Sequence, residues 1–110
     1  MVSRASSPNS FRIEFSGDLT IRSITENYER LREAVKAHDA VAADISDDAE
    51  CDLTFVQLFE SARRSAAEGG KTFRLTRPAA GRLLETLQRG GFLSDADADR
   101  RDFWSSQSGD

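Results

Sequence analysis

The sequence predicts an α/β fold with a mixed four-stranded sheet, in the element order β-β-α-β-α-β-α. Two observations indicate this class. Short apolar runs typical of strands alternate along the chain with three segments whose apolar residues recur every three or four positions, as on one face of a helix. Strands that alternate with helices require a sheet that is mostly parallel. A chain of 110 residues is long enough for one domain with a single core.

The first two strands are expected to form a β-hairpin at the start of the sheet. Phe11, Ile13 and Phe15 alternate with polar residues, which is the pattern of a half-buried strand. Residues 16–18 (Ser-Gly-Asp) have the length of a hairpin turn, and the alternation resumes over residues 19–21. We therefore predict that these two segments pair antiparallel.

The first helix and the third strand follow. Ser23 and Glu26 have the S-x-x-E spacing of a capping box, so the helix is expected to begin at Ser23 and to end near His38. Residues 40–45 form a short apolar run that predicts a central strand buried on both faces. This strand is expected to end at Asp44 and Ser46.

The second helix begins at Asp52 or at Thr54, because both residue types are competent N-caps, and it is expected to close at residues 69–70 (Gly-Gly). Residues 73–75 predict a fourth strand. Pro78 suits the first turn of a third helix, which is expected to stop at residues 90–91 (Gly-Gly).

Composition divides the chain into three parts. Residues 1–10 are polar and expected to be flexible, residues 11–93 form the folded domain, and residues 94–110 are an acidic, Ser-rich tail. Phe103 and Trp104 are the only apolar feature of the tail. The tail is either disordered or docked through this pair on the domain or on a partner.

Charge and cysteine content exclude several classes of function. A net charge of -4 and a pI of about 5.0 argue against nucleic-acid binding, which requires a concentrated positive face. The single Cys51 cannot form an internal disulfide, and no apolar run approaches the roughly 18 residues that cross a bilayer. The N-terminus lacks the apolar stretch of a signal peptide. We expect a cytoplasmic protein without direct membrane insertion.

No motif indicates an enzyme, a cofactor or a metal site. Residues 70–72 (Gly-Lys-Thr) resemble the end of a P-loop, but Ser65 stands where the first Gly is required, and the segment leads from helix to strand. The acidic residues 48–52 lack the Gly and Glu of a calcium loop. His38 has no Ser or Cys placed to make it a catalytic base, and acidic neighbours disfavour a reactive Cys51 thiolate.

Thr54 is the residue with two alternative interpretations. It can cap the second helix, with Gln57 completing a T-x-x-Q capping box. It can also be a phosphorylation or partner-contact site, because free N–H groups at a helix start stabilise an anion. Its acidic surroundings would make a phosphorylated surface strongly negative, which would block a partner without unfolding the domain.

Residues 11–93 resemble a STAS domain, the fold of bacterial anti-sigma factor antagonists. Three short motifs carry the resemblance: residues 17–21 (Gly-Asp-Leu-Thr-Ile) before a helix, Asp44-Ile45-Ser46 followed by Asp52-Leu53-Thr54, and the Gly-Gly-Phe-Leu of residues 90–93. In antagonists of this family the strand-to-helix segment reads Asp-Ser-Ser-Gly, and a kinase of the GHKL ATPase type phosphorylates the second Ser. The resemblance matches Asp52 to the Asp and Thr54 to that Ser, whereas Leu53 and Phe55 replace the first Ser and the Gly.

The resemblance implies a non-enzymatic signal-transduction module that binds a partner through the start of the second helix (Asp52, Leu53, Thr54, Phe55 and Gln57). The implied partner is a GHKL-type kinase or anti-sigma factor, or a chemotaxis histidine kinase, with Thr54 as phosphoacceptor. Phe55 is either an exposed anchor for the partner or a core residue. The alternatives are a STAS subunit of a bacterial lipid ABC transporter, which grips an ATPase through a Thr in this region, and a small-ligand-binding or self-assembling domain with an apolar pocket. The oligomeric state, monomer or weak dimer, stays open.

Overall fold

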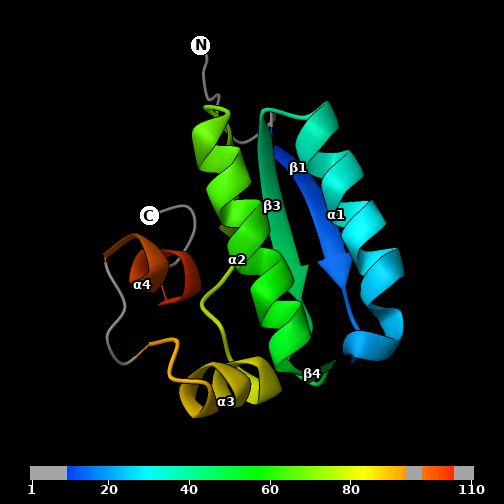
Figure 1. Ribbon diagram of the computed structural model, residues 1–110, viewed down its shortest axis with the longest axis vertical. Coiled ribbons are helices and arrows are strands. Elements are labelled where there is room, and N and C mark those ends of the chain that lie inside the picture. The colour runs from blue at the N-terminus through cyan, green and yellow to red at the C-terminus, as the bar shows by residue number, and fades with distance from the viewer. Residues whose placement is uncertain (1–9, 94–97, 106–110) are drawn as a thin grey trace.

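The computed structural model describes residues 10–93 and 98–105. Within these residues the chain forms four α-helices, one 3-10 helix and five strands (Figure 1). In chain order they are β1 (Ser10–Phe15), β2 (Asp18–Leu19), η2 (Ile21–Ser23), α1 (Ile24–Ala37), β3 (Ala40–Ile45), β4 (Glu50–Cys51), α2 (Leu53–Glu68), β5 (Thr72–Leu75), α3 (Gly81–Arg89) and α4 (Ala98–Ser105).

The main sheet contains three parallel strands in the order β1-β3-β5. Its register aligns Phe11 with Val41, and Val41 with Phe73. Because each parallel pair needs a crossover and both crossovers move in the same direction across the sheet, the right-handed rule places α1 and α2 on the same face. Figure 1 shows the two helices side by side over the strands. The expected α/β class and mostly parallel sheet are confirmed.

The predicted N-terminal hairpin is wrong. β1 pairs with β3, while β2 pairs with β4 in a separate parallel pair, so the described strands form two small sheets instead of one mixed sheet of four strands. Gly17, at φ 77°, turns the chain after β1. The carbonyl of Gly17 then accepts from the Glu50 amide at 2.8 Å. Alternation of apolar residues shows that a segment is a strand but not which strand it pairs with, and β4 is too short to show any period.

An aromatic cluster fills the space between the helices and the sheet. Phe59 is fully buried and contacts Phe15 edge to face at 5.3 Å between ring centroids. On its other side it meets Phe73 of β5 at 5.4 Å. Aromatic pairs at such distances add to the free energy that their buried area contributes. This cluster ties β1, α2 and β5 together.

The central strand β3 is buried as predicted over residues 41–43, where Val41, Ala42 and Ala43 are 1%, 6% and 1% exposed. Val41 and Ala43 share one face of the sheet, and Ala42 lies on the other. α2 and α3 also end at the predicted glycine pairs, with Gly69 and Gly90 as their C-caps, and the following Gly70 and Gly91 have a positive φ.

The first helix starts where predicted, with Ser23 as the N-cap residue of α1, but the predicted capping box is not formed and the Ser23 side chain makes no cap bond. Its hydroxyl instead donates to the carbonyl oxygens of Asp18 and Thr20 and accepts from Asn27. α3 begins at Gly81 and not at Pro78. Gly81 has φ 59°, and a Cβ there would lie 2.3 Å from the Asp47 carbonyl oxygen. The first residue of α3 therefore approaches the Asp47 backbone at a distance that only a glycine allows.

The tail segment α4 docks on the domain. Of the two alternatives that the sequence left open for Phe103 and Trp104, disorder or docking, the structure shows docking. Phe103 is 8% exposed and Trp104 is fully buried. The Trp104 indole N–H donates to Glu60 of α2 at 2.7 Å, and the Ala79 amide donates to the Trp104 carbonyl at 2.7 Å. In Figure 1, α4 lies beside α2 on the side away from α1.

Glu60 is a buried carboxylate with three partners. Besides Trp104, it pairs with Arg63 at 2.8 Å and with Arg100 at 3.3 Å. Burial by itself raises the pKa of Glu60, but the hydrogen bonds from Arg63 and Trp104 and the charges of Arg63 and Arg100 outweigh it, and the net pKa is lowered. Glu60 is therefore ionised at neutral pH and holds α4 against α2 through charge-assisted bonds.

We predict that Trp104→Ala lowers the free energy of unfolding by about 3–5 kcal/mol, because it removes a buried aromatic side chain and the indole partner of Glu60. Urea denaturation followed by circular dichroism measures this change. The control is Asp102→Ala on the exposed side of the same helix, for which we expect a change within about 0.5 kcal/mol. Equal effects of the two variants would show that α4 does not dock.

Candidate functional site

Asp52 caps α2 and also holds the preceding segment in place. One carboxylate oxygen accepts from the Phe55 amide at 3.2 Å, the usual N-cap bond. The other accepts from the Ile21 amide at 2.9 Å, from a residue 31 positions earlier in the chain. Of the two N-caps that the sequence allows, the structure therefore uses Asp52. The same side chain fixes η2 beside the start of α2.

Thr54 is the second residue of α2 and is half-buried. Among residues 10–93 and 98–105, its hydroxyl has no hydrogen-bond partner, and the capping box with Gln57 is not formed. Gln57 is exposed one turn further along the helix. Within the described residues, the Thr54 hydroxyl therefore takes no part in capping α2.

Two exposed apolar side chains lie near Thr54. Leu53 is 44% exposed, and Ile21, whose amide is bonded to the Asp52 carboxylate, is 64% exposed. Leu53 also reaches α3, since a Cβ on Gly90 would lie 2.7 Å from its Cδ2 atom. We refer to Ile21, Leu53, Thr54 and Gln57 as the α2 N-terminal surface. It combines two exposed apolar side chains with a hydroxyl that has no hydrogen-bond partner among the described residues.

Ile21 is the member of this surface that sequence reasoning missed. The sequence pattern assigns it to a strand, whereas the structure places it in η2, with its side chain turned outward. No local pattern in the sequence marks this position, because residues 21 and 53 are brought together by long-range contacts, the pairing of β2 with β4 and the bond from the Ile21 amide to Asp52.

Phe55 belongs to the core. It is fully buried and packs edge to face on Phe15 at 5.7 Å between ring centroids. Of the two roles that the sequence allows, anchor or core, the structure shows the second. The exposed apolar side chain of this turn is Leu53 instead.

Asp44 and Ser46 lie at the end of β3 and make structural contacts. Asp44 accepts from Arg12, from Thr76 at 3.3 Å and from Arg77 at 3.4 Å. Partial burial by itself raises the pKa of Asp44, but the hydrogen bond and charge of Arg12 and the charge of Arg77 lower it overall. The Ser46 amide donates to the Phe15 carbonyl at 2.9 Å, and its hydroxyl donates to Asp48. Both residues thus connect the carboxyl end of β3 to residues on or next to β1 and β5.

Cys51 is a weak nucleophile at neutral pH. Burial, assisted by the negative charge of Asp52, raises the pKa of its thiol to about 11. Since the thiolate is the reactive form, the thiol at this position is inert under ordinary conditions. Within the described residues, no group of three or more His, Cys, Asp or Glu side chains is placed to hold a metal ion.

We predict that Asp52→Ala lowers the free energy of unfolding by about 1–3 kcal/mol, because it removes both the helix cap and the bond to the Ile21 amide. Thr54→Ala is the matched neighbour, and we expect a change below about 0.5 kcal/mol because its hydroxyl makes no bond. Thermal denaturation of both variants measures the difference. A Thr54→Ala variant as unstable as Asp52→Ala would contradict the assignment of the cap.

We also predict that alkylation of Cys51 by iodoacetamide at pH 8 is roughly two orders of magnitude slower in the folded protein than in the urea-unfolded chain. The rate should rise about tenfold with each pH unit up to pH 10, since burial keeps the thiol protonated until the pH nears its raised pKa. A rate that levels off below pH 9 would mean that the thiol is not shielded.

Comparison with known families agrees with this architecture. A family model described as "Mlab, STAS domain" matches residues 2–93, so all elements except α4 lie inside the matched segment. No curated protein matches the chain. In the described part of the chain, no helix has the length and apolar character needed to span a membrane. The match covers most of the 110 residues, and the chain belongs to the STAS domain family.

Proposed function

We propose that this STAS domain is a non-enzymatic regulatory module that binds a protein partner through the α2 N-terminal surface, with Thr54 as a phosphoacceptor. The observation that carries the proposal is the half-buried Thr54 hydroxyl, which has no hydrogen-bond partner within residues 10–93 and 98–105 and follows the exposed Leu53 in the first turn of α2. The exposed Ile21 is held at the same helix start through the bond from its amide to Asp52. A small apolar patch around a hydroxyl group suits a protein interface, where apolar anchors lie beside polar groups. Asp52 supports the surface from below instead of contacting the partner directly.

The electrostatics of α2 support a switch that acts on binding. A phosphate on Thr54 adds about -1.5 to -2 charges at the first turn of a helix, where the dipole favours an anion. The Phe55 amide is already bonded to Asp52, however, so the phosphate would stand beside a carboxylate that holds this donor. An apolar partner surface would then meet a desolvated charge, which is costly. Phosphorylation therefore weakens binding and leaves the fold intact.

The family resemblance supports a partner of the GHKL ATPase type, either a kinase that is also an anti-sigma factor or a chemotaxis histidine kinase. Such a partner would meet the domain in the bacterial cytoplasm, and it would supply the phosphate as well as the docking surface. The domain itself would supply the acceptor hydroxyl and the apolar patch, with no residue of its own taking part in catalysis.

A second candidate function is a STAS subunit that holds the ATPase of a lipid ABC transporter. Leu53 is exposed at the position where phosphorylated antagonists carry a Ser. An apolar side chain here favours a lasting contact over the access of a kinase active site. In this case the Thr54 hydroxyl would be a permanent interface group, and phosphorylation would play no part.

We predict that Thr54→Glu weakens partner binding by at least about tenfold, because it places a charge in the apolar patch. Thr54→Ala should bind with nearly unchanged affinity if phosphorylation controls the contact. Gln88→Glu, an equal charge change on the exposed side of α3, is the control and should have no effect. The affinities are measured by calorimetry with the partner captured from the native host. The identity of this partner, a kinase or a transporter ATPase, separates the two candidate functions. Indistinguishable affinities of the Glu and Ala variants would refute the switch.

A further inference from the structure

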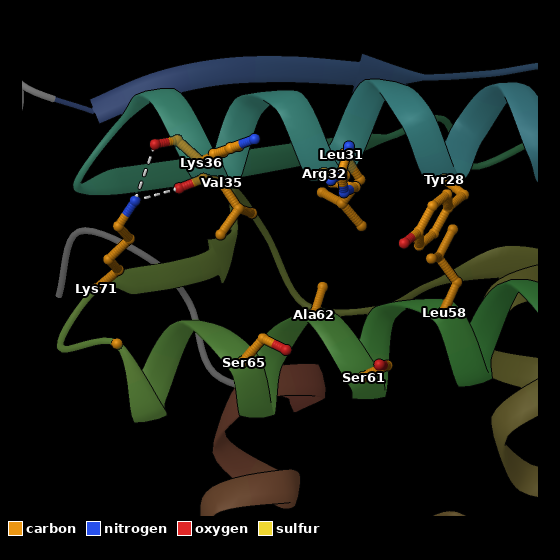
Figure 2. Close-up of a pocket in the computed structure, with 11 residues that line it drawn as sticks. Tyr28, Leu31, Arg32, Val35, Lys36, Leu58, Ser61, Ala62, Ser65 and Lys71 are labelled. Atoms are coloured by element: carbon orange, nitrogen blue, oxygen red, sulfur yellow. Dashed lines mark hydrogen bonds between the residues drawn. The ribbon is translucent and has the colours of Figure 1, made fainter.

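A groove of about 400 Å³ lies between α1 and α2, away from the first turn of α2. Figure 2 shows side chains of both helices turned toward it, with Tyr28 and Leu58 at one end and Lys36 and Lys71 at the other. Aliphatic side chains line the middle, Leu31 and Val35 from α1 and Ala62 from α2. This volume lies in the range of small-molecule sites.

The sheet explains why the groove exists. The parallel order β1-β3-β5 fixes the axes of α1 and α2 side by side, at a spacing that the strands determine. On the α2 side, the residues that follow Leu58 along the groove are small, Ser61, Ala62 and Ser65, so their side chains do not fill the gap. The space is therefore a consequence of the backbone arrangement and the side-chain sizes together.

Among the residues that the structure describes, the charged residues that line the groove are all basic. They are Arg32, Lys36 and Lys71, whereas the chain as a whole carries a net charge of -4. The Lys71 ammonium donates to the carbonyls of Val35 and Lys36 at 2.7 and 3.1 Å, which fixes it at the C-terminal end of α1 (Figure 2). The groove is thus a local positive site on an acidic protein.

Arg32 and Lys36 make this charge available. Within the described residues neither has an ion pair or a hydrogen bond from its side chain, whereas Arg12, Arg22 and Arg77 each pair with carboxylates. The two cations stand four positions apart on α1, an arrangement of like charges that costs helix stability. An anion between them would relieve that repulsion.

The shape of the groove selects the form of the anion. Tyr28 and Lys36 are eight positions apart on α1, so the groove runs about 12 Å from its apolar end to its basic end. We propose that it binds a carboxylate with a linear alkyl chain, such as a medium-chain fatty acid. The chain lies along Leu31, Val35 and Ala62, and the carboxylate lies near Lys36, Lys71 and Arg32. A narrow slot between two helices fits a single free molecule better than the surface of a bilayer.

The test uses decanoate and the full-length protein. Calorimetry should show saturable binding of one decanoate per chain, and the proton resonances of the ring of Tyr28, the single tyrosine, should shift with the same affinity. The double variant Arg32→Gln/Lys36→Gln should bind at least about tenfold more weakly, because it loses two charge-assisted contacts. Arg64→Gln/Arg89→Gln removes the same charge from exposed positions outside the groove and should bind like the parent.

Two further measurements make the outcome decisive. Ala62→Phe fills the groove without changing its charge and should abolish decanoate binding. If this variant fails to fold, the two double variants at exposed arginine and lysine residues still test the proposal. Uncharged decanol should bind at least about tenfold more weakly than decanoate. The proposal is overturned if decanoate does not saturate, if both double variants bind alike, or if the protein sediments with phosphatidylglycerol vesicles through Arg32 and Lys36 while ignoring free decanoate.

Discussion

The parallel pairing of β1 with β3 and of β3 with β5 is the constraint on which the rest of the structure depends. Two successive right-handed crossovers in one direction place α1 and α2 on the same face of the sheet. From this follow the aromatic core beneath the helices, centred on Phe59, and the groove between them. It also fixes the start of α2 near the carboxyl end of β3, the edge at which α/β folds commonly place their functional groups.

The α2 N-terminal surface is rigid because its supports are all buried or bonded. Asp52 accepts two backbone N–H groups from segments far apart in the chain, and Phe55 directly beneath is locked into the core. Leu53 and Thr54 therefore lie on a preformed helix turn, which would leave little ordering entropy to offset if this surface binds a partner as we propose. Asp52 and Phe55 hold this turn in place, whereas Leu53 is the side chain that the turn exposes.

Local patterns in the sequence predicted most elements and the family, but not the pairing of the strands. The run over residues 40–45 and the glycines that end α2 and α3 have local causes, and these predictions are confirmed. The hairpin failed because pairing depends on long-range contacts such as that of Glu50 with Gly17. The sequence also left the cap undecided between Asp52 and Thr54, and it did not show the bond from Asp52 to the Ile21 amide, 31 positions earlier in the chain. The sequence left open whether the segment that forms α4 docks on the domain, because its docking involves Glu60, a carboxylate that looks like an ordinary surface residue in the sequence.

Helix α2 carries both proposed sites, and this raises the question of whether they communicate. Thr54 and Leu58 are four positions apart, so the partner surface and the apolar end of the groove lie about one turn, or 6 Å, from each other on the helix. Coupling through a shift of the helix would disrupt the packing of Phe55 and Phe59, both fully buried, as well as the bond from Trp104 to Glu60. Packed cores resist such displacement. We therefore expect that a ligand in the groove does not alter the α2 N-terminal surface through movement of α2.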